Sequence, residues 1–475
     1  MIFNQWPWLY WAEKSPTDIA LITENRQYCW HQLVAKINAI AANFQRQLLA
    51  PQQMTLMLRG KNGLSMLLCQ LALLQLGARI LPLNPQLPES SITELTAGLA
   101  IDYMIDFTEE PLSLPNIKSL DYRAVITKSP NFQDDVTVAV PFMPLLPATL
   151  ILTSGSTGLA KAVVHNIAAH LNSARGLLAL LPFQREDCWL LSLPLFHVSG
   201  QGIIWRWLFR GARLAIKATS SLPHALQQCS HASLVPTQLW RLLQIKNIEQ
   251  KASLQNVLLG GAMIPHELVA AAKQHGIRCW LGYGMTETAS TVCAKQADSG
   301  IGIGLPLTGK SLRLVNSEIY IQADSLALGY WWQGKVLPLA LVNGWFASRD
   351  KGAFAEGEWR ILGRLDNQFF SGGEGIQPED IEAILNSHPD IKQSFIIPIA
   401  DREFGHRPVA VIESDNQQLV TSLNQWLENR LAAFQRPIAY YLLPRMLIEN
   451  AGIKLSRHNI KQWLLQHHND DNKRV

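Results

Sequence analysis

Short apolar runs alternate with amphipathic helical patterns along most of this chain, and no other feature restricts its fold as strongly. Runs typical of buried strands are followed by segments whose apolar residues recur at helical spacing, which predicts a parallel-sheet α/β architecture. The expected strands are Tyr103–Phe107, Thr149–Leu152, Trp189–Ser192, Ala232–Val235, Asn256–Leu259 and Arg278–Leu281, and the expected helices include Asn166–Leu181 and Pro265–His275.

The pattern changes twice toward the C-terminus. Around Leu312–Asp324, short strands joined by turns predict a small β subdomain. After Arg364 a separate series of strands and helices begins, as expected for a small α+β domain. A chain of 475 residues is long enough for two or three domains. We therefore predict an N-terminal domain over residues 1–364 and a C-terminal domain over residues 365–475.

Composition and charge exclude several classes of protein. With 48% hydrophobic and 16% charged residues the chain is a soluble globular protein. The net charge of +4 is small and no dense basic run is present, so no nucleic-acid partner is expected. The N-terminus lacks the features of a signal peptide. Polar residues interrupt the most apolar stretch, 66–83, so we expect a buried helix and a strand there and no membrane span.

The six cysteines are scattered and form no CxxC pair. Such spacing predicts reduced thiols and a cytoplasmic protein.

Two enzyme classes find no support in the motifs. No GxGxxG follows a first strand with an acidic residue about twenty positions later, as a dinucleotide-dependent oxidoreductase needs. The histidines form no HExxH or comparable cluster, as a metal hydrolase needs.

The strongest local motif is TSGSTGLAK, residues 153–161, directly after an apolar strand. Small residues let the backbone turn tightly and bring N–H groups close to an anion, while hydroxyls and a terminal lysine add donors and charge for phosphates. The motif is not a Walker A loop, because Ala160 and Ala162 occupy positions that such a loop reserves for Gly and Ser/Thr.

This loop resembles the phosphate loop of the adenylate-forming ligase superfamily, which includes acyl- and aryl-CoA ligases, luciferases and peptide-synthetase adenylation domains. Further motifs of that superfamily follow in the same order and span essentially the whole chain. They are PLFHVSG (194–200), LGGAMIP (259–265), GYGMTE (282–287), SRDKG (348–352), GRLDNQFFSGGEGIQPEDIE (363–382) and GIKLSR (452–457).

The resemblance implies that ATP and Mg²⁺ are bound, that an acyl-adenylate forms, and that coenzyme A then accepts the acyl group. It implies that Glu287 helps to hold Mg²⁺, that Thr286 contacts the α-phosphate, and that Asp350 accepts hydrogen bonds from the ribose. Arg364 would assist at the ribose. The residues implied to bind the ATP phosphates are Thr153, Ser154, Gly155, Ser156, Thr157, Gly158 and Lys161, and those implied near adenine are Gly260, Gly261, Tyr283 and Gly284.

The resemblance also implies a mobile C-terminal domain. Lys454 matches the catalytic lysine of adenylation, although Ile453 separates it from the glycine that usually precedes it. Asp366 falls at the hinge about which the C-terminal domain swings between the two half-reactions. Gly372 and Gly373 would lie near the path of the CoA pantetheine, but the same stretch also suits a surface turn.

Several segments resemble the o-succinylbenzoate–CoA ligases of menaquinone biosynthesis more closely, among them 192–208, 231–243, 282–295 and 365–379. Their substrate carries two carboxylates, of which one is activated and the other must be neutralised where it is buried. Arg206, within the apolar helix IIWRWLF, is the candidate for that role because guanidinium binds carboxylate in a bidentate manner. His197 is expected near the aryl ring and is also a candidate catalytic residue. Further pocket candidates are Ser199, Gln201 and Thr237.

Other readings remain open at this point. Arg206 could instead reach the surface or pair with an acid elsewhere, and His197 could be a core histidine. The chain could be another aryl- or acyl-CoA ligase acting on benzoate, coumarate or a fatty acid, or a non-catalytic nucleotide-binding relative. The expected partners are small molecules, and the resemblance allows a homo-oligomer because related ligases are often dimers or larger.

Overall fold

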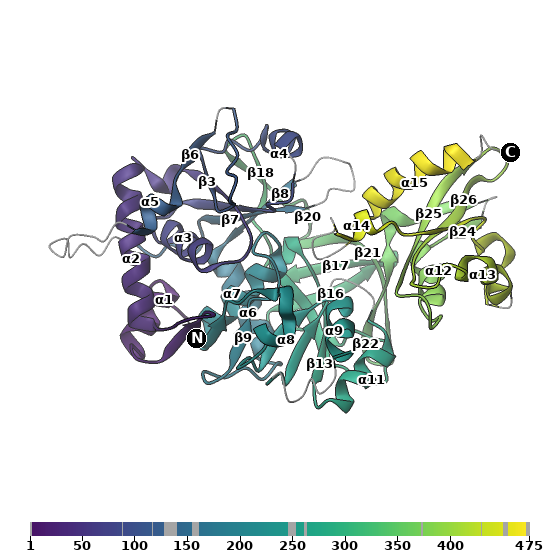
Figure 1. Ribbon diagram of the computed structural model, residues 1–475, viewed down its shortest axis with the longest axis horizontal. Helices are drawn as coiled ribbons and strands as arrows, with labels where there is room; N and C mark the ends of the chain where they lie inside the picture. Colours follow the sequence, from purple (N-terminus) through teal and green to yellow (C-terminus); the bar gives the residue numbers. More distant parts are fainter. Residues whose placement is uncertain are drawn as a thin grey trace.

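The computed structural model describes most of the chain and contains two lobes (Figure 1). The large lobe contains the N-terminus, and the small lobe contains the C-terminal helix. The described residues are 2–87, 89–115, 117–127, 140–153, 161–245, 253–260, 264–371, 374–428, 430–449 and 455–471.

The first sheet of the large lobe has a parallel centre with antiparallel edges. From β13 through β12, β11, β9 and β10 to β1, neighbouring strands run parallel, whereas β14, β15 and β2 pair antiparallel at the two edges. The strand order is β15 (Leu305–Pro306), β14 (Ser290–Gln296), β13 (Arg278–Met285), β12 (Asn256–Leu259), β11 (His231–Leu234), β9 (Cys188–Leu190), β10 (Arg213–Ala215), β1 (Ile19–Ile22) and β2 (Gln27–Cys29).

The second sheet of the large lobe has the same mixed character. Strands β7, β4, β3, β5 and β6 are parallel, and β8, β18 and β19 extend the sheet antiparallel. The strand order is β19 (Lys335–Pro338), β18 (Gly329–Trp332), β8 (Lys161–Asn166), β7 (Pro147–Thr153), β4 (Arg79–Leu83), β3 (Thr55–Arg59), β5 (Tyr103–Asp106) and β6 (Lys118–Leu120).

Helices join the two sheets through one continuous apolar core. The predicted helix and strand within residues 66–83 are α3 (Leu64–Gln75) and β4, and α3 is buried nearly throughout. Within the described residues, the other α-helices of the large lobe are α1 (Pro7–Lys14), α2 (Trp30–Gln47), α4 (Glu89–Thr96), α5 (Tyr122–Thr127), α6 (Ile167–Leu178), α7 (Val198–Arg210), α8 (Leu222–Ala225), α9 (Pro236–Leu243) and α11 (His266–Gln274).

The N-terminal tryptophans attach α1 to this core. Trp8 Nε1 donates to the Gln75 side chain at 2.7 Å, and Trp11 Nε1 donates to the Leu208 carbonyl at 2.7 Å. Both indoles are buried and each N–H group has an acceptor, so neither ring leaves a buried donor without a hydrogen bond. The tryptophans therefore serve packing.

A small antiparallel sheet follows the two large sheets, as the sequence predicted around residues 312–324. Its strands are β16 (Lys310–Val315), β17 (Glu318–Ala323), β20 (Leu341–Val342), β21 (Trp345–Ala355) and β22 (Glu358–Arg364). This sheet ends at Arg364, and the next strand begins at Phe369.

The small lobe has a sheet and apolar clusters of its own. Its strands are β23 (Phe369–Ser371), β24 (Glu374–Ile376), β25 (Gln393–Asp401), β26 (Gly405–Glu413) and β27 (Tyr440–Leu442), and its helices are α12 (Pro378–Leu385), α13 (Leu419–Leu427), α14 (Arg445–Glu449) and α15 (Arg457–Asp471). The predicted fold class is confirmed: parallel-type α/β layers, a small β subdomain and an α+β C-terminal domain. None of the described helices combines the length and apolar character needed to cross a bilayer.

Candidate active site

Three residues predicted near the nucleoside meet at one point in the structure. Tyr283 from β13 donates its hydroxyl to Asp350 Oδ2 at 2.6 Å, and Arg364 from β22 donates to Asp350 Oδ1 at 3.0 Å. Burial raises the pKa of Asp350, while Arg364 and Tyr283 oppose that effect. Each carboxylate oxygen has more than one acceptor position. Asp350 can therefore hold a further pair of hydroxyl donors, as a ribose would supply.

Arg364 links this cluster to the start of the small lobe. Its second terminal nitrogen donates to Asp366 Oδ2 at 3.1 Å, while the first contacts both Asp350 and the Ser348 carbonyl. Asp366 is exposed and lies in the short turn η4 (Leu365–Asn367). The predicted hinge residue is thus tied through one guanidinium to the predicted ribose residue.

The phosphate-loop motif connects β7 to β8, an antiparallel hairpin in which Thr153 and Lys161 are paired. Thr153 Oγ1 donates to the Lys161 carbonyl at 3.3 Å. The Lys161 ammonium is exposed and lies 5.2 Å from the ring centre of Tyr330, within cation–π range. The loop residues Ser154, Gly155, Ser156, Thr157 and Gly158 lie outside the described residues.

Tyr330 also contacts the predicted metal residue. Its hydroxyl donates to Glu287 Oε1 at 3.1 Å, and burial, together with Glu287, raises the pKa of Tyr330 so that the phenol stays protonated. Within the described part of the chain, no three His, Cys, Asp or Glu residues form a metal site. Mg²⁺ usually binds one or two carboxylates together with substrate phosphates. A single carboxylate at Glu287 fits an ion that arrives with ATP.

Thr286 and Glu287 belong to the short turn η3 (Thr286–Thr288) after β13. Gly284 precedes the turn at a point where any Cβ would meet the Ser290 carbonyl oxygen at 1.9 Å, so only glycine fits. On the far side, His165 from β8 is fully buried and its Nε2 lies 2.7 Å from the Thr286 carbonyl. The backbone in and just before the turn therefore contacts Ser290 of β14 and His165 of β8.

Arg206 lies in the middle of α7 with 2% of its surface exposed. Its guanidinium donates to Ser290 Oγ at 3.0 Å and Thr291 Oγ1 at 3.3 Å and lies 5.4 Å from the Trp189 ring centre. Burial lowers the pKa of Arg206 to about 9. Among the described residues no carboxylate pairs with it, so neither surface exposure nor an internal acid balances this charge.

The other pocket candidates lie at helix N-termini. His197 precedes α7 and Ser199 lies in its first turn, both half-buried, and burial lowers the pKa of His197 to about 4. Thr237 lies half-buried at the start of α9. Asn62 fixes the approach to α7: its amide nitrogen donates to the carbonyls of Leu191 and Leu193 at 3.2 and 2.8 Å.

Gln201 differs from the other candidates because its side chain is fully buried and engaged on both polar atoms. Its nitrogen donates to the Leu195 carbonyl at 2.8 Å, and its oxygen accepts from Gln70 of α3 at 2.9 Å. Both groups therefore hold the loop before α7 against α3. Of the remaining candidates, Gly260 directly follows β12, and Lys454, Gly261, Gly372 and Gly373 lie outside the described residues.

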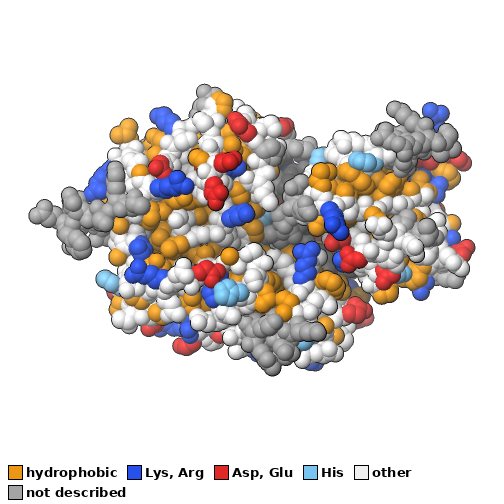
Figure 2. Space-filling view, viewed as in Figure 1, with side chains coloured by type: hydrophobic (Ala, Val, Ile, Leu, Met, Phe, Trp, Pro, Cys, Tyr) orange, Lys and Arg blue, Asp and Glu red, His pale blue; other side chains and the backbone are white. Residues whose placement is uncertain are grey.

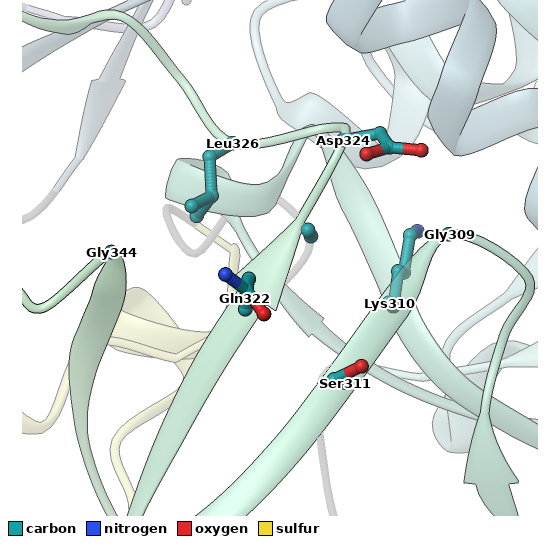
Figure 3. A pocket seen from close by; sticks show the side chains of 8 residues that line it. Gly309, Lys310, Ser311, Gln322, Asp324, Leu326 and Gly344 are labelled. Atoms are coloured by element: carbon teal, nitrogen blue, oxygen red, sulfur yellow. The ribbon is translucent and has the colours of Figure 1, made fainter.

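A cavity of about 530 Å³ lies beside the small β sheet, where Lys310, Gln322 and Asp324 line it together with Gly309, Ser311, Ala323, Leu326 and Gly344 (Figure 3). None of the predicted site residues lines it. On the face drawn in Figure 2, positive and negative side chains are interspersed and neither sign dominates. Neither feature competes with the cluster around Asp350 and Glu287.

Tyr330, Asn62 and His165 were not predicted as site residues. Tyr330 contacts the predicted residue Glu287, and His165 contacts the Thr286 carbonyl, whereas Asn62 contacts the loop that leads to His197. Each comes from a separate strand or loop outside the quoted motifs. Tyr330 lies in the segment GYWW, whose pattern predicts only an aromatic strand. His165 lies in an apolar strand, where the pattern predicts only a buried core histidine. For His165 and Tyr330 the only signal was a position on the strand that follows the phosphate loop or on the strand opposite it, and this becomes visible once β8 and β18 are paired. Asn62 carried no such signal.

Comparison with known proteins matches both lobes. The model of the AMP-binding enzyme family matches residues 9–331, and that of the AMP-binding enzyme C-terminal domain matches residues 380–452. The 2-succinylbenzoate–CoA ligase of Escherichia coli (strain K12) is 47% identical over 98% of this chain and 99% of its own length. The protein of that name from Salmonella typhimurium is 46% identical over 98% and 99%.

Among solved structures, a variant of E. coli MenE with bound OSB-AMS superposes with a TM-score of 0.89 at 45% identity, covering 98% of this chain and 99% of that one. One family model spans well over half of this chain, and the relatives are similar along nearly their full length. The chain therefore belongs to the AMP-binding enzyme family and, within it, to the 2-succinylbenzoate–CoA ligases.

Proposed function

We propose that this protein joins 2-succinylbenzoate to coenzyme A in two steps at one site, as part of menaquinone biosynthesis. A carboxylate oxygen of the acid attacks the α-phosphorus of ATP, the bond to the bridging oxygen breaks, and pyrophosphate leaves. The CoA sulfur then attacks the acyl carbon, the thiol proton is released, and AMP leaves. We expect the enzyme to act in the cytoplasm, because its scattered cysteines form no disulfide framework.

Positioning and charge neutralisation are the main requirements of the first step. In this proposal Asp350, fixed by Tyr283 and Arg364, binds the ribose hydroxyls. Glu287 would hold the Mg²⁺ that enters with ATP, and bound there the ion would neutralise phosphate charge. Thr286 contacts the α-phosphate.

Cations complete the proposed adenylation site. Lys161 and the loop before it bind the outer phosphates, with Gly260, Gly261 and Gly284 beside the adenine. Lys454 bridges the attacking carboxylate and the α-phosphate. The swing about Asp366 then brings Gly372 and Gly373 to the CoA path.

The observation that carries the substrate assignment is the charge of Arg206, which pairs with no carboxylate in the described part of the chain. A buried guanidinium without an acidic partner is costly, and a substrate carboxylate that is not activated would compensate it. Only an acid that carries a second carboxylate can pair with Arg206 while its first carboxylate is activated. His197, Ser199 and Thr237 would line the rest of the acyl pocket, and we assign Gln201 a structural role behind it because both of its polar atoms are engaged.

An assay of several acids tests the proposal. The purified protein is supplied with ATP, Mg²⁺ and CoA and with 2-succinylbenzoate, benzoate, 4-coumarate or octanoate, and pyrophosphate and thioester are followed together. We expect turnover of 2-succinylbenzoate alone and a KM for it at least tenfold higher in Arg206→Met. Arg210→Met, one turn further along α7, is the control and should leave KM unchanged.

Other outcomes separate the remaining readings. Preference for a monocarboxylate, unchanged by Arg206→Met, would retain acid–CoA ligation and refute both the substrate and the role of Arg206. Absence of pyrophosphate release with every acid would indicate a nucleotide-binding relative without this activity.

A further inference from the structure

Every backbone carbonyl of the turn η3 (Thr286–Thr288) accepts a hydrogen bond from a group outside the turn. His165 Nε2 lies 2.7 Å from the first carbonyl oxygen, the Ala327 amide donates to the second at 2.8 Å, and Ser325 Oγ donates to the third at 2.9 Å. One donor comes from β8 and two come from the loop after β17. Distant parts of the chain therefore converge on three consecutive peptide groups.

The backbone that follows this turn is strained. Ala289 has φ 52° and Ser290 has φ 106°. Residues other than glycine rarely adopt positive φ values. Such a conformation persists only where the surrounding structure holds it firmly. Ala289 N also donates to the Thr286 carbonyl at 3.1 Å, so the first strained residue is bonded to the same oxygen that His165 contacts.

The chemistry of the contact fixes the state of His165. A carbonyl oxygen can only accept, so the proton of this hydrogen bond must lie on Nε2. The imidazole is fully buried, its Nδ1 has no hydrogen-bond partner in the described part of the chain, and its ring lies 5.0 Å from that of His170. Burial lowers the pKa of His165 to about 4, so the ring is neutral at physiological pH.

We propose that His165 is a positioning residue for adenylation: its Nε2–H holds the backbone of η3 and thereby sets the Thr286 hydroxyl and the Glu287 carboxylate against the nucleotide. The inference rests on the proposed function for the identity of the reaction. It does not depend on which acid is the substrate, because the turn carries Thr286 and Glu287, whose proposed roles are toward ATP. Ser325 acts on the same turn through the Thr288 carbonyl.

The first test is hydrogen exchange of the unliganded protein, followed by mass spectrometry of peptides that cover 283–291. We expect His165→Leu to speed exchange in this segment at least tenfold. His165→Gln should restore slow exchange, because its amide nitrogen can replace Nε2–H as a donor. The matched control is His231→Leu, which removes a buried imidazole whose Nε2 lies 2.6 Å from the Pro182 carbonyl and should leave the segment unchanged.

The second test separates the half-reactions. Displacing a catalytic group by about 1 Å costs about 100-fold in rate, so we expect His165→Leu to lower kcat for pyrophosphate release about 100-fold. The KM for the acid, and the rate of thioester formation from supplied acyl-adenylate and CoA, should change less than threefold. His165→Gln should recover most of kcat, and Ser325→Ala provides a second, smaller perturbation if His165→Leu folds poorly.

Failure of this inference is distinguishable from failure of the proposed function. Unchanged exchange over 283–291 in both His165→Leu and Ser325→Ala would overturn the positioning role, whatever acid is turned over. Equal loss of both half-reactions, matched by His231→Leu, would also overturn it, since that pattern indicates general destabilisation. Faster exchange in His165→Leu, together with a wild-type protein that does not turn over 2-succinylbenzoate, would support the role of His165 and refute the substrate assignment.

Discussion

Tyr283 and Asp350, 67 positions apart in the sequence, are joined by a hydrogen bond of 2.6 Å from the phenol to one carboxylate oxygen. Burial and the adjacent carboxylate raise the pKa of Tyr283 well above its ordinary value, so the phenol remains a donor throughout the physiological range. The bond leaves the second oxygen of Asp350 to Arg364. The orientation of Asp350 is thus fixed by the protein before any nucleotide binds.

Replacing Tyr283 with Phe should weaken ATP binding. Loss of a hydrogen bond to a charged acceptor costs about 1.5–3 kcal/mol, which corresponds to a KM for ATP raised about tenfold or more, with a smaller effect on kcat. Steady-state kinetics with ATP as the varied substrate measures this. Tyr320→Phe, in β17 of the small β sheet, is the control and should leave the KM for ATP unchanged. An equal response of the two variants would argue against orientation of Asp350 by Tyr283.

Tyr330 should influence the metal requirement, because its hydroxyl contacts Glu287 while its ring faces Lys161. Tyr330→Phe removes the first contact and keeps the second, so we expect the Mg²⁺ concentration for half-maximal adenylation to rise several-fold. Tyr330→Leu removes both and should also raise the KM for ATP. Titration of pyrophosphate release with Mg²⁺ at fixed ATP distinguishes the two. Identical titration curves for wild type and Tyr330→Phe would contradict the assignment.

Lys310 predicts a pH dependence of stability. It is buried, its ammonium donates to the Thr291 carbonyl, and burial together with the nearby Arg206 lowers its pKa from 10.5 to about 7. Between these two pH values the unfolded chain binds one more proton than the folded protein. The free energy of unfolding therefore rises with pH across this window, and the penalty for burying the charge is complete only below about pH 7.

Lys310→Met should remove this dependence. We expect the variant to gain stability relative to wild type at pH 6, and the gain to shrink by on the order of 2 kcal/mol by pH 9. Thermal unfolding at a series of pH values measures the difference in Tm. Lys335→Met, at an exposed position of β19, should show a difference that does not vary with pH. A pH-independent difference for Lys310→Met would mean that its ammonium titrates normally.

The sequence predicted those parts of the fold and site that depend on local pattern. The alternation of apolar runs and helices located β12 with its observed bounds, and the motif order singled out Tyr283, Asp350 and Arg364, which the fold brings together. The antiparallel edges of the large sheets were not predicted. Whether a strand adds parallel or antiparallel is decided by the path of its connection, and the strand's own residues carry little of that information.

Side-chain contacts between elements far apart in the sequence could not be predicted from local pattern either. Gln201 was expected to line the acyl pocket, and the fold places Gln70 opposite it. Tyr330 and His165 reach the turn at Glu287 only because β8 and β18 are neighbours. A single sequence does not show which strands are paired, so these supporting residues become visible only in the structure.

Asn62 offers a prediction about the acyl pocket. Its amide nitrogen donates to the Leu191 and Leu193 carbonyls, and its oxygen accepts from the Leu195 amide at 2.9 Å, so one side chain fixes the loop that leads to His197. Asn62→Asp keeps the acceptor but replaces two donated bonds with repulsion between oxygens, which costs about 2–3 kcal/mol. We expect a KM for 2-succinylbenzoate raised at least fivefold with the KM for ATP unchanged, measured by pyrophosphate release. Asn172→Asp, at a half-buried position of α6 where the amide nitrogen donates to the Asp324 carbonyl, is the control. A parallel rise in both KM values would show that Asn62 supports the whole lobe and has no particular effect on the acyl pocket.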